Sequence, residues 1–459
     1  MASVKKYFGN IISSSKISIS KFKTSGVFNS KDNYMQRLSD LWPLEGVWCA
    51  FKSSITTSSN TYLSGPVTLK VGSDYSIYTT YTTKTTDRVS YIVKHSPSGS
   101  VIWQNQLPST EKATELCIDS LDNCYVMSEY DVSGYYTYVF ISKYSSDGTM
   151  LWRRYIFSSS SNVNTNNCFI GIDGNLYACV TKYSTTTGIC YKLDTDGNLI
   201  SKSTLPYGAM VFQNNAGTFY VVSYWNSTTY VYKFSNSLSG SYTSSIAISG
   251  PSGGYIGLLY NTPTIDSYGV IYLHGSYCTT TGSTKPLGVT VRLNSSLSWL
   301  STTTFADPGS TSIYTPCTTN NSVISGNYIY IISSEYTPYS YVHCYNTSNF
   351  SVVWVMRLSG NSSNFPPARL EKDNKGNIYL YYGYYALKLL PDISVVGSYT
   401  LYDKTISIIE KTDLTYAGPS ITLGAASYTI SANTDADLYF YTAGVSSTNS
   451  NLTFYNITL

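Results

Sequence analysis

Two kinds of residue in this chain could carry catalytic chemistry. Gly250–Gly254 reads Gly-Pro-Ser-Gly-Gly, and in many hydrolases a Gly-x-Ser-x-Gly sequence presents a nucleophile such as Ser252 between a strand and a helix. Here strand-like sequence stands on both sides, so we interpret it as a connector between strands. Three histidines, His95, His274 and His343, could act as general bases, but none lies at metal-ligand spacing from another. We therefore expect neither zinc chemistry nor a histidine base.

One acidic stretch resembles the beginning of a calcium-binding loop. Asp194, Asp196 and Asn198 have the right spacing, but position twelve is Leu205, where such loops carry glutamate. We predict an ordinary hairpin turn here. Carboxylates are too sparse to nominate a facing pair for glycoside hydrolysis, and the chain has no Gly-rich phosphate loop. The sequence thus predicts no catalytic residue, no cofactor and no metal.

The composition favours strands and turns. Charged residues make up 12% of the 459 residues, while 47 are tyrosine and Ser, Thr and Asn are abundant. Tyr and Thr suit half-buried strands, and Ser, Asn and Gly suit turns, so the fold class expected is all-β. The net charge of +3 is spread evenly, so nucleic acid is not an expected partner. The chain shows neither a secretory signal nor a transmembrane stretch, and membrane insertion is not expected.

The cysteines indicate free thiols. The chain has nine, an odd number with scattered spacing and no Cys-x-x-Cys pair. Most stand in apolar strand patterns, where a free thiol behaves as a small apolar side chain. We expect buried thiols and synthesis in a reducing compartment, the cytoplasm of a host cell.

The turns and strands that would position these residues recur along the chain as a repeat. Seven times a Gly- or Asn-containing turn leads into an aromatic strand, as in Ile172–Tyr177, and a second strand with one basic residue follows. The basic positions, spaced 41 to 59 residues apart, are Lys94, Lys143, Lys192, Lys233, Arg292, His343 and Lys388. We expect each stem to pack while the charge reaches one rim. The alternative is a cationic ring that binds an anionic ligand.

A third strand follows a turn such as Ser-Asp-Gly and ends in tryptophan at Trp103, Trp152 and Trp354. We expect each indole to fill the wedge between two neighbouring sheets. Units of about 50 residues predict a single seven-bladed β-propeller of four-stranded blades. The expected divisions are an N-terminal arm at 1–62, the propeller at 63–403 and a C-terminal β segment at 404–459. The repeat resembles the degenerate repeats of pyrroloquinoline-quinone-type and related bacterial propellers.

The N-terminal arm contains the best helical pattern, with Ser30 as a possible N-cap and Pro43 as a stop. Gly26-Val27-Phe28, then Tyr34, then Trp42-Pro43 resembles a segment of virion structural proteins of tailed bacteriophages. The resemblance implies a particle protein of the tail or an attached appendage. The docking candidates are Phe28, Tyr34, Trp42 and Pro43; alternatively, the three aromatic residues only cap the propeller floor.

We therefore expect a non-enzymatic structural protein located in the virion tail. Its expected partners are other virion proteins, present in multiple copies and bound through tyrosine-rich surfaces. One alternative is a receptor- or glycan-binding module at the tail tip that serves host attachment. The other is a propeller enzyme, either a quinone-dependent dehydrogenase or a hydrolase.

Overall fold

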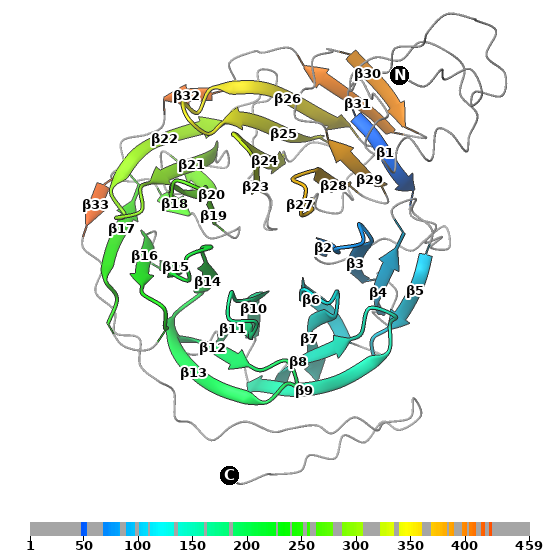
Figure 1. Ribbon diagram of the computed structural model, residues 1–459. Coiled ribbons are helices and arrows are strands. Elements are labelled where there is room, and N and C mark those ends of the chain that lie inside the picture. The colour runs from blue at the N-terminus through cyan, green and yellow to red at the C-terminus, as the bar shows by residue number, and fades with distance from the viewer. Residues whose placement is uncertain are drawn as a thin grey trace, which may run out of the picture.

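The computed structural model is a ring of antiparallel β-sheets around a central axis (Figure 1). All elements of the described residues are strands, so the all-β propeller fold is confirmed. No helix in the described residues is long and apolar enough to cross a membrane. The structure describes residues 47–52, 68–82, 89–96, 101–108, 111–132, 136–159, 163–182, 187–225, 228–238, 241–250, 255–257, 263–278, 287–305, 322–334, 339–359, 369–382, 385–389, 397–401, 404–409, 415–417 and 422–424.

The first three blades each contain four consecutive strands, ordered from the axis outward. The first is β2 (Thr68–Val71), β3 (Ile77–Thr82), β4 (Ser90–His95) and β5 (Val101–Gln106). The second is β6 (Glu111–Ile118), β7 (Cys124–Val132), β8 (Tyr136–Tyr144) and β9 (Met150–Ser159). The third is β10 (Val163–Ile170), β11 (Leu176–Lys182), β12 (Thr187–Leu193) and β13 (Leu199–Pro206).

The next three blades follow the same plan, except that two short strands share one neighbour in the fifth. The fourth contains β14 (Met210–Gln213), β15 (Phe219–Trp225), β16 (Thr228–Phe234) and β17 (Ser244–Ser249). The fifth contains β18 (Tyr255–Gly257), β19 (Thr264–Ile265), β20 (Ile271–Cys278), β21 (Leu287–Leu293) and β22 (Trp299–Phe305). The sixth contains β23 (Ser322–Ser325), β24 (Tyr328–Ser334), β25 (Tyr339–Asn346) and β26 (Val352–Ser359).

The remaining sheet is a composite. It contains β27 (Arg369–Lys372), β28 (Ile378–Tyr382) and β29 (Tyr385–Leu389), and its outer strand is β1 (Val47–Lys52). Four further strands lie outside other blades: β30 (Gly397–Leu401), β31 (Lys404–Ile409), β32 (Thr415–Ala417) and β33 (Thr422–Gly424).

The expectation of a seven-bladed propeller is therefore corrected to six blades and one composite sheet. Six blades are built from consecutive strands, whereas the last sheet takes its outer strand from the opposite end of the chain. In register, Val47 lies opposite Leu389 and Lys52 opposite Tyr385. The expected arm at 1–62 thus contributes a propeller strand, because pairing at this edge covers backbone groups that β29 would otherwise expose. The predicted helix lies outside the described residues.

Both faces of the sheets are buried because neighbouring blades pack against each other. One apolar cluster joins Tyr125 and Met127 of β7 with Leu176 and Val180 of β11. Another joins strands of the fourth and fifth blades in the same way. This packing is why the middle strands have nearly continuous apolar sequences rather than alternating ones.

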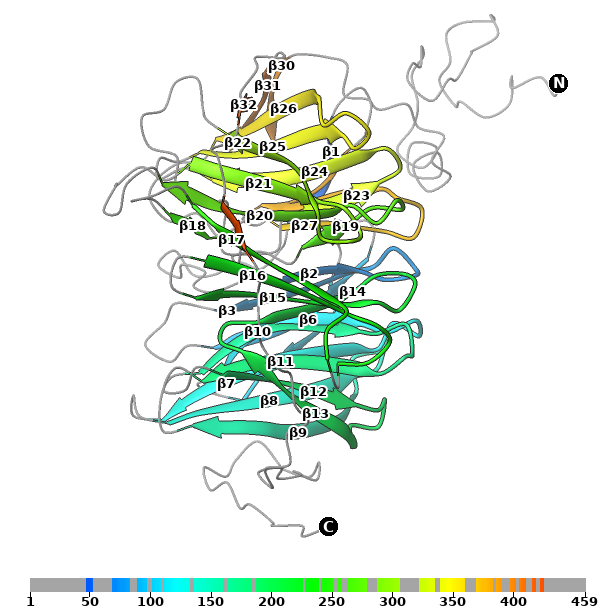
Figure 2. The same cartoon turned by 90° about the vertical axis from the view of Figure 1, so that its left-hand side faces the viewer.

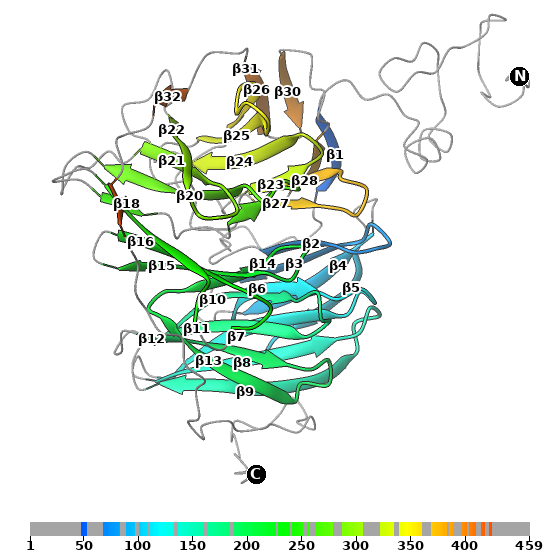
Figure 3. The same cartoon turned by 60° about the vertical axis from the view of Figure 1, so that its left-hand side comes forward.

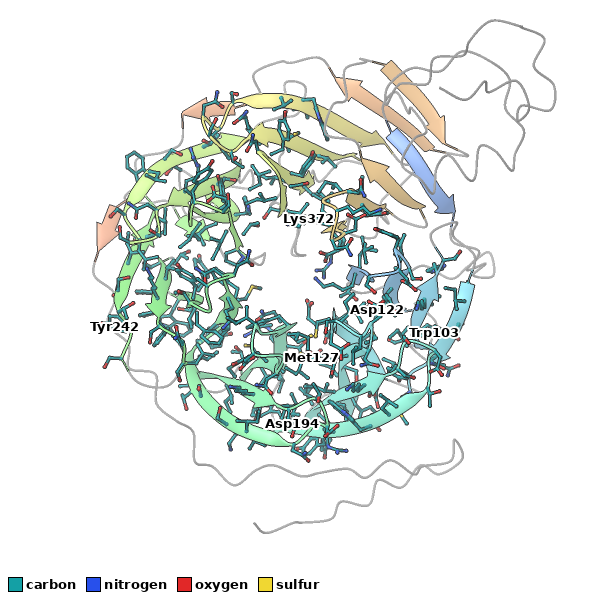
Figure 4. All side chains as sticks on the ribbon, in the orientation of Figure 1. Trp103, Asp122, Met127, Asp194, Tyr242 and Lys372 are labelled. Carbon is teal, nitrogen blue, oxygen red and sulfur yellow. The ribbon has the colours of Figure 1, made fainter. Side chains whose placement is uncertain are left out.

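Polar contacts join the composite sheet to the blades on either side. Lys70 of β2 forms an ion pair with Glu371 of β27 at 2.6 Å, and Arg369 lies 3.8 Å from Glu115 of β6. On the other side, the Lys372 ammonium donates to the Ile324 carbonyl at 2.8 Å. Figure 4 shows Lys372 near the centre of the ring. The two ends of the propeller are thus joined at the inner strands as well as by β1.

Candidate functional site: the turn rim

One rim of the ring carries an inner turn, which leads into the second strand from the axis, and an outer connection between the next two strands of each blade. Figures 2 and 3 show the ring from the side, with these coloured turns gathered along one edge. We call this edge the turn rim. It contains most of the positions that the repeat pattern singled out.

The inner turns of three blades share an aspartate–tyrosine arrangement. One oxygen of Asp266 accepts the backbone N–H groups of Tyr268 and Val270, and the other accepts the Tyr272 hydroxyl at 3.0 Å. Asp119 and Asp373 repeat these contacts with the tyrosine six residues on. The residue patterns did not predict a role for these aspartates, although each stands six residues before its tyrosine and this constant spacing could have revealed them. Burial is the main cause that raises the pKa of Tyr272, and the Asp266 charge adds to it.

The outer turns are held by the preceding blade. The Lys143 ammonium and the Trp152 indole N–H both donate to the Thr195 carbonyl, at 2.8 and 3.0 Å. Arg154, two residues after the tryptophan, donates to the Gly197 carbonyl at 3.2 Å. We call this arrangement the interblade clamp.

The same clamp occurs one blade earlier. Lys94 and Trp103 donate to the Ser146 carbonyl at 3.2 and 3.0 Å, and Asn105 donates to the Gly148 carbonyl at 2.6 Å. The prediction that tryptophan fills the wedge between blades is confirmed for Trp152, which is buried in a cluster with residues of the third blade. Figure 4 shows Trp103 and Asp194 toward the outside of the ring. The repeated lysine and tryptophan therefore join blades.

Each clamp requires glycine in the turn that it holds. Gly148 and Gly197 have φ angles of +91° and +80°. A Cβ atom on Gly148 would lie 2.8 Å from the Trp103 ring, and one on Gly197 would lie 3.0 Å from the Trp152 ring. The Asp-Gly turn thus meets a conformational and a steric demand at once.

Three of the other basic positions lie at the same rim with varied partners, whereas in the sixth blade Cys344, not His343, takes the position opposite Tyr330 and Trp354. Lys192 pairs with Asp173 at 2.8 Å. Lys233 and Arg292 donate to turn carbonyls of the following blade, Ser295 and Thr347, at 2.6 and 3.3 Å. His343 is buried in β25, and Lys388 lies in β29 opposite Tyr379.

We expected each basic side chain to carry its charge out to the rim, but at two positions the structure shows the charged group buried. Lys94 and Lys143 are only 5% and 7% exposed. Their ammonium groups lie against turn carbonyls and over the Tyr78 and Tyr125 rings, at 5.0 and 5.1 Å from the ring centroids. The physical reason is that a carbonyl and an aromatic face together replace water around the cation. The ammonium groups of Lys94 and Lys143 therefore bind turns of the neighbouring blade, which leaves them poorly placed to bind an external ligand.

The solvent-facing side of the turn rim carries large apolar side chains among exposed polar turn residues such as Asp147 and Asn198. Ten of the eleven exposed large apolar side chains in the described residues lie there, and only Trp225 lies elsewhere. Three stand in inner turns, among them Leu121 (75% exposed) and Tyr268 (79%). The others stand near the start of β5, β9, β13 and β22, in pairs such as Met150–Leu151 except for Ile200. The full set is Val101, Ile102, Leu121, Met150, Leu151, Ile172, Ile200, Tyr268, Trp299 and Leu300. Repetition at equivalent turns places large apolar side chains on the rim of the first, second, third and fifth blades, as expected of an interaction face.

A hollow of about 710 Å³ opens between inner strands β10, β14 and β19, with Lys70 also in its wall. Its amide side chains are used to join blades: Asn167 donates to the Val211 carbonyl at 2.6 Å, and Gln213 accepts the Ile172 N–H at 2.9 Å. The hollow is thus walled by structural contacts.

The remaining candidates do not converge on one place. His274 is buried, its Nδ1 lies 2.8 Å from the Thr290 hydroxyl, and burial lowers its pKa to about 3. Asp194 accepts the N–H groups of Asp196 and Asn198, so the predicted hairpin turn is confirmed. Among the described residues, no three His, Cys, Asp or Glu side chains are grouped to hold a metal.

Other predicted positions are distributed as follows. The six described cysteines are buried thiols that form no disulfide: Cys117, Cys124, Cys168, Cys179, Cys190 and Cys344. Ser252 and the docking candidates Phe28, Tyr34, Trp42 and Pro43 lie outside the described residues.

No protein-family model and no curated protein sequence matches this chain. Solved structures with a similar arrangement include a Bacteroides caccae protein of unknown function, with 13% identity, a TM-score of 0.36, and 65% of this chain and 93% of that one covered. A subtype N10 neuraminidase-like protein of A/little yellow-shouldered bat/Guatemala/060/2010 has 10% identity, a TM-score of 0.36 and coverages of 80% and 99%. Prolyl oligopeptidase B from Galerina marginata has 9% identity, a TM-score of 0.40 and coverages of 72% and 47%. At these values the three proteins carry no information about what this chain binds.

Proposed function

We propose that this chain is a non-enzymatic structural component of a tailed-phage virion, in the tail or an attached appendage. In this proposal the turn rim binds a neighbouring virion subunit. The observation that carries the proposal is the gathering of ten exposed apolar side chains on that rim. Large apolar side chains left in water at repeated positions favour association, because docking removes them from water. The virion setting is supported by the resemblance of Gly26–Pro43 to particle proteins.

The rim is also suited to docking by its stiffness. Leu121 and Tyr268 stand in turns whose backbones are held by Asp119 and Asp266. Preorganised side chains lose little conformational freedom on binding, so more of their burial contributes to affinity.

The test replaces three inner-turn side chains together, Leu121→Ser, Ile172→Ser and Tyr268→Ser. Trp225→Ser is the matched control because Trp225 is also exposed but lies at the other end of its blade. Purified particles are assayed for the protein by quantitative mass spectrometry, with circular dichroism as a check on folding. We expect the triple variant to be depleted from particles and the control to be retained. Equal incorporation, or absence of the wild-type chain from particles, would overturn the proposal.

The N-terminal segment is tested separately. Deletion of residues 1–45 removes Phe28, Tyr34, Trp42 and Pro43 but leaves β1 in place to complete its sheet. If these residues dock the propeller to the particle, the deleted protein stays folded and soluble but is not incorporated. Wild-type incorporation would exclude that role.

A second candidate is glycan binding at the same rim. Tyr268 and Trp299 are 79% and 47% exposed there, and aromatic rings with a polar edge suit sugar faces. Glycan-array binding by the wild-type protein that is lost in Tyr268→Ser, with particle incorporation unchanged, would favour this function over subunit docking.

A further inference from the structure

The turn rim differs in charge from one side of the ring to the other. The rim turns of the second and third blades, residues 119–123, 145–149, 171–175 and 194–198, contain six aspartates and no lysine or arginine. The equivalent turns of the fifth blade contain one aspartate, and the composite sheet places Lys375 in its inner turn. Figure 1 shows the second and third blades side by side. We call their rim the acidic arc; its aspartates are Asp119, Asp122, Asp147, Asp173, Asp194 and Asp196.

The basic side chains that reach these turns are largely used within the protein. Lys94 and Lys143 donate to turn carbonyls and are buried. Lys192 forms an ion pair with one of the six aspartates, and Arg154 donates to the Asp196 carbonyl at 3.1 Å. Six carboxylates therefore face four cations, two of which are buried.

Two carboxylates of the outer turns are open to solvent. Asp147 and Asp196 precede the turn glycine at equivalent positions of consecutive blades, and both are exposed. The Ser145 hydroxyl donates to Asp147 and holds the pKa of that carboxyl below its usual value, so the group is ionised at neutral pH. The acidic arc thus presents negative charge to solvent.

Large apolar side chains stand beside these acids. Leu121 and Ile172 lie in the inner turns, each next to an aspartate in the sequence. Met150, Leu151 and Ile200 follow the outer turns, three or four residues after an exposed aspartate. Such a surface suits a partner that carries basic and apolar side chains together, because docking removes apolar area from water while opposite charges orient the two proteins. Nucleic acid and anionic membranes would be repelled.

We propose that the acidic arc binds a basic amphipathic segment of the subunit that docks on the turn rim, with lysine or arginine side chains against the carboxylates and apolar side chains between them. The inference rests on the proposed docking function and adds the chemistry and the position of the partner. Because the arc covers two neighbouring blades, the segment lies to one side of the ring axis. Lys375, 4.7 Å from the centroid of the Tyr75 ring, disfavours the same segment at the composite sheet.

The fifth blade supplies a matched control. Trp299–Leu300 take the positions at the start of β22 that Met150–Leu151 take at the start of β9, and all four side chains are 42% to 47% exposed. The turn before Trp299, residues 294–298, contains no acid, whereas the turn before Met150 contains Asp147. The two pairs thus share position and exposure and differ in the neighbouring charge.

The probe is a fluorescently labelled amphipathic peptide of leucine and lysine, and its control is a peptide in which glutamate replaces every lysine. Binding to the full chain is followed by fluorescence anisotropy, with circular dichroism as a check on the fold of each variant. We expect Asp147→Asn with Asp196→Asn to weaken binding of the leucine–lysine peptide by about two- to thirtyfold in low salt, and less in high salt. The charge-preserving pair Asp147→Glu and Asp196→Glu should bind as the wild type does. Met150→Ser with Leu151→Ser should weaken binding, whereas Trp299→Ser with Leu300→Ser should not.

Three results would overturn the inference: equal binding of the two peptides, no binding of the leucine–lysine peptide, or equal loss in the Met150–Leu151 and Trp299–Leu300 variants. Particle incorporation separates it from the docking function. If Asp147→Asn with Asp196→Asn enters particles as the wild type does while the triple serine variant is depleted, docking stands and the acidic arc is not used. If the triple serine variant is fully incorporated, docking itself fails. Depletion of the asparagine variant, reversed in the glutamate variant, would support both.

Discussion

The interblade clamp makes a sharp prediction about two glycines of the third blade. Gly174 lies in the inner turn and Gly197 in the outer turn, with φ angles of +76° and +80°. An added Cβ atom meets nothing within 4 Å at Gly174, but at Gly197 it lies 3.0 Å from two ring atoms of Trp152. Alanine substitutions at these positions therefore share the backbone cost and differ in the contact.

The magnitude follows from this difference. Placing alanine in a left-handed conformation costs about 1–2 kcal/mol at either position. Overpacking against a buried side chain adds about 1–3 kcal/mol, and it applies only at Gly197. Gly197→Ala is therefore expected to lower the free energy of unfolding by about 1–3 kcal/mol more than Gly174→Ala does.

The assay is urea unfolding followed by circular dichroism, with hydrogen exchange in β9 and β13 as a local readout. A Trp152→Leu background provides the control, because the extra cost at Gly197 should shrink when the indole is absent. Equal destabilisation by the two alanines, or an unchanged gap in the Trp152→Leu background, would refute the role assigned to this contact.

The remaining predictions concern other contacts of the ring. Lys143→Met removes a charged donor from the Thr195 carbonyl and is expected to lower the unfolding free energy by about 1.5–3 kcal/mol; a urea midpoint equal to that of the wild type would contradict this. Tyr272→Phe removes the hydroxyl that donates to the Asp266 carboxylate and should cost about 1.5–3 kcal/mol in the same assay, whereas no loss would show that water replaces it. Burial lowers the pKa of His274 to about 3, below the unfolded value near 6.5, so the stability that its neutral form contributes is present above pH 6.5 and is lost as pH falls toward 3. Thermal unfolding of His274→Gln should therefore depend less on pH in that window than the wild type, and parallel profiles would contradict the assignment. Glu371→Gln removes the Lys70 ion pair, whose side chains are 31% and 20% exposed, so it should cost less than about 1 kcal/mol and the difference should fade in high salt; a larger, salt-independent loss would indicate a different role.

The local parts of this fold could be predicted from the chain alone, because they depend on residues close in sequence. An Asp-Gly turn and the short strands on either side of it depend on residues that lie within one short stretch of the chain. The repeat of these elements predicted blades, and tryptophan after a turn predicted an anchor between blades. The chemistry of the candidate site was less accessible. A basic residue in a strand pattern does not reveal whether its partner is solvent, a ligand or a neighbouring carbonyl.

Only the tertiary structure determined how distant segments pair. Backbone hydrogen bonds at a sheet edge accept almost any extended sequence, so no residue pattern in Val47–Lys52 marks it as the partner of β29. The same reason explains why β31, β32 and β33 could not be assigned to β26, β22 and β17 in advance. The exposed apolar side chains of the rim also gathered only when turns about 50 residues apart were brought to one edge of the ring. Local side-chain chemistry specifies each blade, whereas closure of the ring decides which edges and surfaces remain available to bind.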